Sequence, residues 1–273
     1  MDEPGYDAEE VAAVFGRAAA TYDSVIPFFS RFGSRLVGLA DLRPGERVLD
    51  VGSGRGATLF PAAAAVTPGG EVLGIDLSEE MVARLQADIG PGGATNVSVR
   101  RMDVEALDVA DGTFDAVIAS FVLHLVPEPA AAAAGLFRAL RPGGRCLAAV
   151  PAGSGPEWEF LVPLIASFAP RALRPPAVPF RADFDLPALL ARAGFEVTTT
   201  DHEEAEFFFA DEQAWWAWGW SNGLRAVFET LAPSDLDELR RKAFTEMTAH
   251  RTAEGLAMHQ RARFVVAHKP LGY

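Results

Sequence analysis

Cysteine is almost absent from this sequence, and basic residues are scarce. The chain has 273 residues and one cysteine, Cys146, so no disulfide can form within it, and nothing points to an oxidising compartment. Lys and Arg number 24 against 37 Asp and Glu, a formal net charge of −13. Clustered cations bind nucleic-acid phosphates and anionic membrane surfaces, so the composition disfavours both as partners.

Long apolar runs and metal-ligand spacings are missing as well. The alanine-rich stretches at Ala62–Ala65 and Ala130–Ala134 are too short to cross a membrane, and the first residues lack a secretory signal pattern. We therefore expect a soluble cytoplasmic protein without a membrane span. The histidines show no ligand spacing, so we expect no metal. Cys146 lies in a predicted buried strand, which indicates a core thiol.

The most informative stretch is a short apolar strand that runs into a glycine-rich turn. Arg47–Val51 is the predicted strand, and Gly52, Gly54 and Gly56 follow it at alternate positions. Glycines allow a tight bend and a close approach of a ligand to the main chain. Asp50 precedes the turn and places a negative charge beside it.

A second predicted strand, Glu71–Asp76, ends in a carboxylate about twenty residues after the turn. A carboxylate at this position is placed to accept both hydroxyls of a ribose. The two strands therefore predict a site for a nucleoside-containing cofactor at this edge of the sheet.

The glycines alone do not identify that cofactor, because the spacing Gly52-x-Gly54-x-x-Ala57 also fits a dinucleotide fingerprint. Asp50 argues against NAD, since its charge would lie where a pyrophosphate must sit. The same charge suits a ligand that carries an ammonium and a sulfonium. An NAD-dependent oxidoreductase stays an alternative at this point.

The downstream segments continue an alternating strand and helix pattern. Phe114–Ser120 is a continuously apolar run typical of a buried parallel strand, and its end lies at the switch point where open α/β sheets bind ligands. The run Leu140–Gly144 makes a tight turn into the strand Cys146–Val150, and Met258–Lys269 is the predicted last strand.

Together these motifs resemble the class I S-adenosylmethionine-dependent methyltransferases, most closely the ubiquinone/menaquinone type and related enzymes of secondary metabolism. The resemblance runs from about Phe15 to Val150 and includes the acid-x-Gly-x-Gly-x-Gly turn and the Leu-Arg-Pro-Gly-Gly run. It implies an α/β fold with a Rossmann-like, seven-stranded, mostly parallel sheet and helices on both faces. An N-terminal helical lid and a helical insertion near the C-terminus complete it.

The resemblance also implies S-adenosyl-L-methionine as cofactor and a set of residues that hold it. Asp103, with the main-chain amide of Val104, would hold the adenine, although Asp103 also fits an ordinary helix cap. The backbone at Ser120 would reach the methionine ammonium. The full predicted set is Tyr22, Asp50, Gly52, Ser53, Gly54, Gly56, Asp76, Leu77, Met81, Asp103, Val104, Ser120 and Phe121.

Two residues are candidates for the chemistry itself. His124 follows the fourth strand and is placed to act as a base, or instead to order its loop. Tyr22 is placed to cover the sulfonium with its aromatic face, or to staple the preceding helix to the core together with Phe15. Methyl transfer needs mainly proximity, orientation and a dry cavity, so a base is required only when the acceptor must lose a proton.

We expect three segments: a helical lid over residues 1–40, a cofactor-binding core over 41–151, and a substrate-covering part over 152–273. The last contains a proline-rich insertion to about Ala182 and an aromatic helix, Asp211–Asn222. Its aromatic density suggests a small hydrophobic acceptor (terpenoid, prenylated or polyketide-like), with C-methylation slightly preferred over O- or N-methylation. The aromatic helix or the N-terminal helices are equally candidates for a homo-oligomer contact. A non-catalytic S-adenosylmethionine-binding protein is the remaining alternative.

Overall fold

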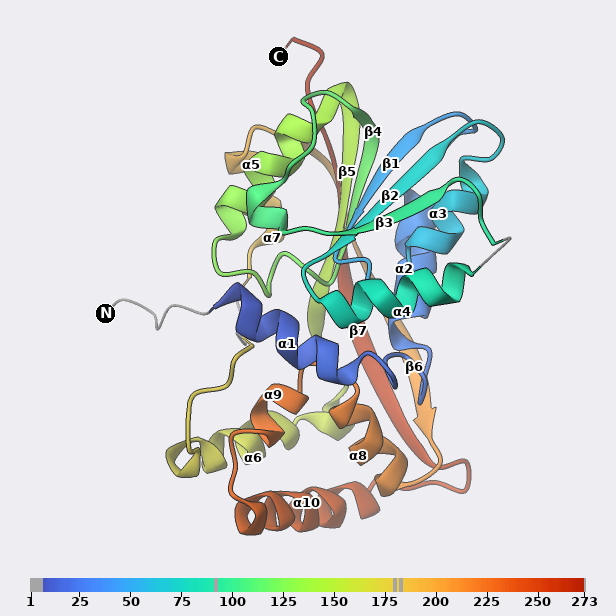
Figure 1. The fold of residues 1–273 in the computed structure, drawn as a ribbon. Coiled ribbons are helices and arrows are strands. Elements are labelled where there is room, and N and C mark those ends of the chain that lie inside the picture. The colour runs from blue at the N-terminus through green and yellow to red at the C-terminus, as the bar shows by residue number, and fades with distance from the viewer. Residues whose placement is uncertain (1–6, 91–92, 179–180, 182–183, 273) are drawn as a thin grey trace.

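The computed structural model describes residues 7–90, 93–178, 181 and 184–272, and a seven-stranded sheet forms its centre (Figure 1). The strand order is β3-β2-β1-β4-β5-β7-β6. The strands are β1 (Arg47–Val51), β2 (Glu71–Asp76), β3 (Val97–Arg101), β4 (Phe114–Ser120), β5 (Leu140–Ser154), β6 (Glu196–Phe209) and β7 (Leu256–His268). Strand β7 is antiparallel to β5 and β6, and the other neighbouring pairs are parallel, which confirms the predicted mostly parallel, Rossmann-like sheet.

The order of the strands reverses between β1 and β4. Val51 at the end of β1 pairs with Ile75 of β2 on one side and with Ala119 of β4 on the other. The glycine turn after β1 therefore lies beside the end of β4. This is the switch point predicted for ligand binding.

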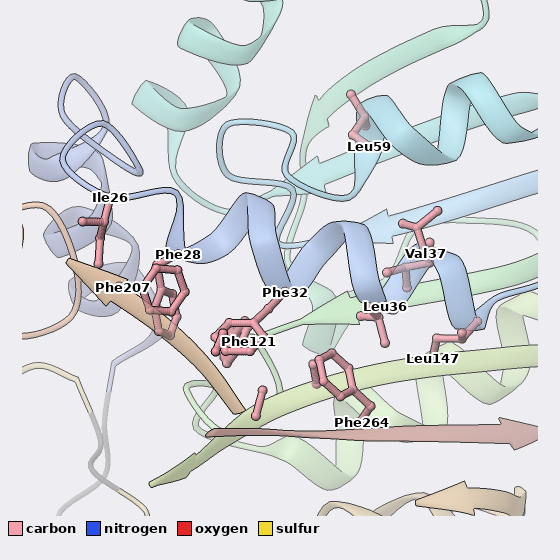
Figure 2. Close-up of a cluster of buried hydrophobic side chains, with 14 of the residues drawn as sticks. Ile26, Phe28, Phe32, Leu36, Val37, Leu59, Phe121, Leu147, Phe207 and Phe264 are labelled. Carbon is pink, nitrogen blue, oxygen red and sulfur yellow. The ribbon is translucent and has the colours of Figure 1, made fainter. Parts of the chain in front are cut away.

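Helices cover both faces of the sheet. One face carries α2 (Phe28–Leu39), α3 (Leu59–Ala65) and α4 (Glu79–Ile89), and the other carries α5 (Pro129–Ala139) and α7 (Leu186–Arg192). Figure 2 shows that Phe32 and Leu36 of α2 point toward Phe121, which follows β4, and Phe264 on β7. The buried Cys146 lies in the core of the opposite face, and burial raises the pKa of its thiol to about 12, as expected of a core residue.

A second group of helices lies beyond the carboxyl ends of β1 to β4 (Figure 1). We call α6 (Leu161–Phe168), α8 (Glu212–Trp220), α9 (Arg225–Phe228) and α10 (Pro233–Thr248) the helical cap. The long strands β6 and β7 extend into this cap, and α1 (Ala8–Ala18) runs between it and the sheet. Asp7 caps α1 by accepting a hydrogen bond from the Glu9 amide.

The structure corrects the predicted start of one strand and adds one helix. Strand β5 begins at Leu140 rather than Cys146, because Leu140 already pairs with Phe114 and the predicted turn is an irregularity within the strand. Helix α2 begins at Phe28, directly after Pro27. The proline-rich segment contains α6, an eight-residue helix that the sequence analysis described only as an insertion. None of the helices in the described ranges combines the length and apolarity needed to cross a membrane.

Candidate functional site

A large cavity opens at the carboxyl edge of the sheet, between the glycine turn, α1 and the helical cap. Its volume is about 1370 Å³. A drug-sized ligand occupies a pocket of roughly 300–1,000 Å³, so this cavity has room for two small molecules side by side. The elements that line it come from both the sheet and the cap.

The glycine turn forms one wall of this cavity. Gly52 and Gly54 both have positive φ, at 62° and 50°, and both line the cavity. A Cβ at Gly52 would lie 2.3 Å from a methyl carbon of Val122, and one at Gly54 would lie 3.5 Å from the ring of Tyr22. Only glycine fits this turn without strain, and the main chain is thereby left bare toward the cavity.

Asp50, Ser53 and Gly56 lie behind that wall rather than on it. Asp50 is fully buried, and its Oδ1 accepts a 2.6 Å hydrogen bond from the Thr58 hydroxyl. Its Oδ2 has no partner among the described residues. Burial is the main reason that the pKa of Asp50 rises to about 7, so the carboxyl is poised near neutral pH.

Asp76 lies at the end of β2, where it lines the cavity and braces the turn. Its Oδ2 accepts a hydrogen bond from the Gly54 amide at 2.9 Å, and its Oδ1 accepts one from the Ser78 amide at 2.9 Å. A carboxylate has about four acceptor positions, so further bonds remain possible toward the cavity. Desolvation raises the pKa of Asp76, and the two amides oppose that rise.

The next wall is made by the segment after β3 and by the start of α4. Asp103 caps the short 3-10 helix Val104–Ala106 by accepting from the Glu105 amide at 2.9 Å, and it also lines the cavity. Asp103 is therefore a helix cap, and its adenine-binding role stays a prediction. Leu77, Met81 and Val104 complete this wall with apolar surface.

Tyr22 covers the turn from the N-terminal side. Its ring stacks on Phe29 at 4.4 Å and meets Phe15 edge to face at 6.4 Å. Desolvation, with the charges of Asp23 and Asp76, raises the pKa of the Tyr22 phenol well above its usual value, so it stays protonated. Ser120 and Phe121, at the end of β4, face the same space, and Phe121 adopts a φ of 57°.

His124 lines the cavity just beyond the end of β4. Its Nδ1 is buried without a partner in the described part of the chain, and its ring lies 6.4 Å from that of Phe184. Burial and the nearby Arg181 lower its pKa to about 3. The imidazole is therefore neutral at physiological pH, with an unsatisfied ring nitrogen.

The cap side of the cavity is mainly aromatic and aliphatic. Trp158 and Trp215 stack at 5.6 Å, and Trp218 lies beside them on α8. Leu161 and Ile165 of α6 line the same region. Such a wall binds a flat, apolar molecule through burial and aromatic contacts.

Comparison with known proteins agrees with this geometry. A family model described as a methyltransferase domain matches residues 48–144. The nocamycin O-methyltransferase of Saccharothrix syringae is 39% identical over 254 residues, which cover 87% of this chain and 90% of that protein. This chain belongs to the class I S-adenosylmethionine-dependent methyltransferases.

One further relative supports the assignment of this methyltransferase, and one solved structure shares its fold. The aklanonic acid methyltransferase DauC of Streptomyces sp. (strain C5) is 35% identical over 174 residues, which are 63% of this chain and 79% of that protein. The YcgJ protein of Bacillus subtilis has the same fold, with a TM-score of 0.62 at 20% identity over 89% of this chain and all of that one. The nicotinamide alternative is thereby set aside.

The described residues fit the methyl donor of this family. The donor is a cationic adenosine compound, and the part of the cavity near the glycine turn is lined by the carboxylates Asp76, Asp103 and Glu105. Gly52 and Gly54 line the same part of the cavity without a side chain. Within the described ranges, no group of three or more His, Cys, Asp and Glu side chains is arranged to hold a metal ion.

Sequence reasoning missed most residues of the cap-side wall. Arg181 and Phe184 approach His124 from the connection before α7, and Met258, Gln260 and Arg263 enter from β7. The proline-rich segment was expected to pack over the site, but no spacing within it singled out Arg181. The apolar faces of α2 and α8 pack inside the chain, and a homo-oligomer stays a prediction.

Proposed function

We propose that this methyltransferase transfers a methyl group to an oxygen of a small, largely apolar metabolite of secondary-metabolite type. One observation carries the proposal: a single continuous cavity joins an acidic, glycine-walled end to an aromatic end. The name of the relative that is 39% identical, an O-methyltransferase, favours oxygen as the methylated atom.

We assign the acidic end to the donor. Asp76 would hold the ribose hydroxyls, Asp103 and the Val104 amide the adenine, and the main chain at Gly52, Gly54 and Ser120 the methionine end. Leu77, Met81 and Phe121 would pack against it. Asp50, Ser53 and Gly56 would not contact the donor but would fix the shape of the glycine turn. When bound, S-adenosylmethionine supplies an electrophilic methyl group on a sulfonium.

The residues of this chain would then act by placement and by exclusion of water. Tyr22, stacked on Phe29, closes the cavity over the glycine turn with an aromatic face that favours a cation. The aromatic wall of the cap orients the acceptor. A neutral His124 has an open ring nitrogen with which to hydrogen-bond the acceptor, but burial makes it a weak base.

C-methylation is the second candidate, and the stacked indoles of Trp158 and Trp215 favour it. Methylation at an alkene carbon leaves a carbocation, which aromatic faces stabilise. The product decides between the two: the new methyl resonance in a nuclear magnetic resonance spectrum lies at the shift of an ether or ester for oxygen, and at that of an alkyl group for carbon.

The deciding experiment is calorimetric titration with S-adenosylhomocysteine, followed by methyl transfer from isotope-labelled S-adenosylmethionine to a panel of apolar phenols, enols, carboxylic acids and prenyl compounds. We expect binding, and transfer to at least one oxygen acceptor. Absence of S-adenosylhomocysteine binding at millimolar concentration overturns the proposal. Binding without transfer to any acceptor points to a non-catalytic binding protein.

A matched pair of glycine variants controls for backbone strain. Gly54→Ala should abolish S-adenosylhomocysteine binding, because φ is positive and the added methyl enters the donor wall beneath Tyr22. Gly45→Ala places a methyl at a similarly positive φ of 89° but in open space before β1, and should bind normally.

A further inference from the structure

The acidic and the basic side chains that line the cavity come from different elements of the fold. Among the described residues, the acidic ones lie at the end of β2 (Asp76) and after β3 (Asp103 and Glu105). The basic ones are Arg174 and Arg181, from the segment between α6 and α7, and Arg263 on β7. A cationic donor explains the acidic end, and the basic residues leave the rest of the cavity suited to an anion.

The three arginines differ in their partners. Arg174 lies 4.0 Å from the carboxylate of Glu229, and the Arg263 guanidinium donates to the His202 ring at 3.1 Å. Arg181 donates to two main-chain carbonyls, those of Val126 at 2.8 Å and Pro127 at 3.2 Å. It forms no ion pair with a carboxylate of the described residues, although Glu105 and Arg181 attract each other at longer range.

The carbonyls of Val126 and Pro127 hold the Arg181 guanidinium in place without neutralising it. His124 lies two residues before Val126, in the same loop, and close enough to Arg181 for the guanidinium charge to lower the pKa of the imidazole. Arg181 and His124 both line the cavity, and the buried Nδ1 of His124 lacks a partner within the described chain. A buried polar group without a partner is costly unless a ligand meets it.

We propose that Arg181 and His124 together bind an ionised oxygen of the methyl acceptor, a carboxylate or an enolate on an otherwise apolar molecule. Arg181 supplies charge-assisted hydrogen bonds, and His124 donates from Nδ1 in its neutral form. This assignment rests on the proposed function and deepens it, because it gives the acceptor a charge class.

The reaction balances without a base. The acceptor oxygen arrives ionised and uses its own electron pair to form the new O–C bond. The C–S bond of the donor breaks, and its electron pair goes to sulfur, which becomes neutral. No proton is released, so a histidine with a low pKa suffices. The methylated oxygen has lost its charge, and with it the attraction to Arg181, which favours release of the product.

The test uses two fluorescent probes of the same shape, anthracene-2-carboxylate and anthracene-2-carboxamide, titrated into protein saturated with S-adenosylhomocysteine. No turnover occurs in this assay. We expect the carboxylate to bind at least about tenfold more tightly than the amide, because a desolvated cation discriminates strongly between them. Arg181→Gln should remove that preference and leave amide affinity unchanged, and Arg181→Lys should restore part of it.

Arg174→Gln is the matched control, since Arg174 lines the same cavity but faces Glu229, and it should keep the wild-type preference. His124→Gln should weaken the carboxylate more than the amide. Equal binding of the two probes to the wild type, or no binding of either at millimolar concentration, overturns the inference. So does an Arg181→Gln variant that weakens both probes equally, because Arg181 would then only brace the loop.

Failure here differs from failure of the proposed function. If the acceptor is neutral, methyl transfer is observed in the acceptor panel while the probes show no charge preference. If the chain does not transfer methyl groups, the charge preference of the cavity still appears in the probe titrations.

Discussion

At the scale of single residues, Asp50 gives the clearest pH dependence. Its pKa is about 7 in the folded chain, against an ordinary value of 3.8. As the pH rises from about 4 to 7, the unfolded state loses this proton first. The stability that the protonated group contributes is therefore complete below pH 4 and lost by about pH 7. The difference between the two pKa values corresponds to at most roughly 4 kcal/mol of folding free energy.

Asn cannot ionise, so Asp50→Asn should stabilise the ligand-free protein at pH 8 by about 1–3 kcal/mol. The gain is smaller than roughly 4 kcal/mol because the group at the Oδ2 position still lacks a hydrogen-bond partner. Stability as a function of pH, from denaturant titrations between pH 4 and 8, provides the measurement. Asp103→Asn, at the same sheet edge but only partly buried, should keep the wild-type slope. If Asp50→Asn loses as much stability toward pH 7 as the wild type does, the raised pKa of Asp50 is contradicted.

Asp76 gives a second prediction at this scale. Both of its oxygens accept from main-chain amides, so the amide nitrogen of Asn would face a donor at one of them. Asp76→Asn should cost about 1–3 kcal/mol in S-adenosylhomocysteine binding, with a loss of stability of similar size. Calorimetry and thermal unfolding measure the two. Asp111→Asn, at an exposed pair with Arg138, should change neither. Unchanged affinity in Asp76→Asn would refute the ribose assignment.

At the scale of elements, the sequence predicts what local chemistry decides. The strand–turn unit from Arg47 to Gly56 and the capped start of α4 at Ser78 follow from apolar runs, glycines and a cap. Helix α6 was not predicted as a helix, because proline-rich flanks hide its eight residues. The burial of Asp50 and the approach of Arg181 to His124 depend on packing between distant segments, which no local pattern encodes.

Helix α1 is the element whose motion we expect to admit ligands, as a lid. It lines the cavity with Val11 and Phe15, and ion pairs hold it at both ends: Glu9 with Arg101 at the end of β3, and Arg17 with Glu229 after α9. The Glu9–Arg101 pair is exposed and the Arg17–Glu229 pair is partly exposed, so each contributes about 0–1 kcal/mol and is weakened by salt.

Arg17→Gln should therefore speed amide hydrogen exchange in α1 by about two- to fivefold, with little change in α2, because the lost pair is worth less than 1 kcal/mol. Added salt should act in the same direction, and S-adenosylhomocysteine should slow the exchange. Arg251→Gln breaks an ion pair with Glu212 away from α1 and should have no effect there. Identical exchange in α1 of Arg17→Gln and wild type would show that the pair does not hold the lid.

At the scale of the whole molecule, the helical cap and the sheet share one continuous core. The same cluster of buried side chains contains Phe32 of α2, Phe264 of β7, Trp215 of α8 and Met247 of α10. Phe209, at the end of β6, connects the parts: its ring lies 6.3 Å from Trp158 and 5.6 Å from Trp218. The cavity is thus enclosed by parts that are packed together, as orientation of two small molecules requires.

Such a core predicts that cap and sheet unfold together. All five tryptophans lie between Trp158 and Trp220, so tryptophan fluorescence reports the cap, whereas far-ultraviolet circular dichroism reports the whole chain. The two signals should give one coincident thermal transition. Phe209→Ala, which empties a fully buried site, should lower stability by about 3–5 kcal/mol in both signals equally. Phe208→Ala, at the exposed neighbour on the same strand, should change little. If fluorescence changes at a lower temperature than dichroism in the wild type, the cap is a separate unit, and the acceptor wall then forms independently of the donor site.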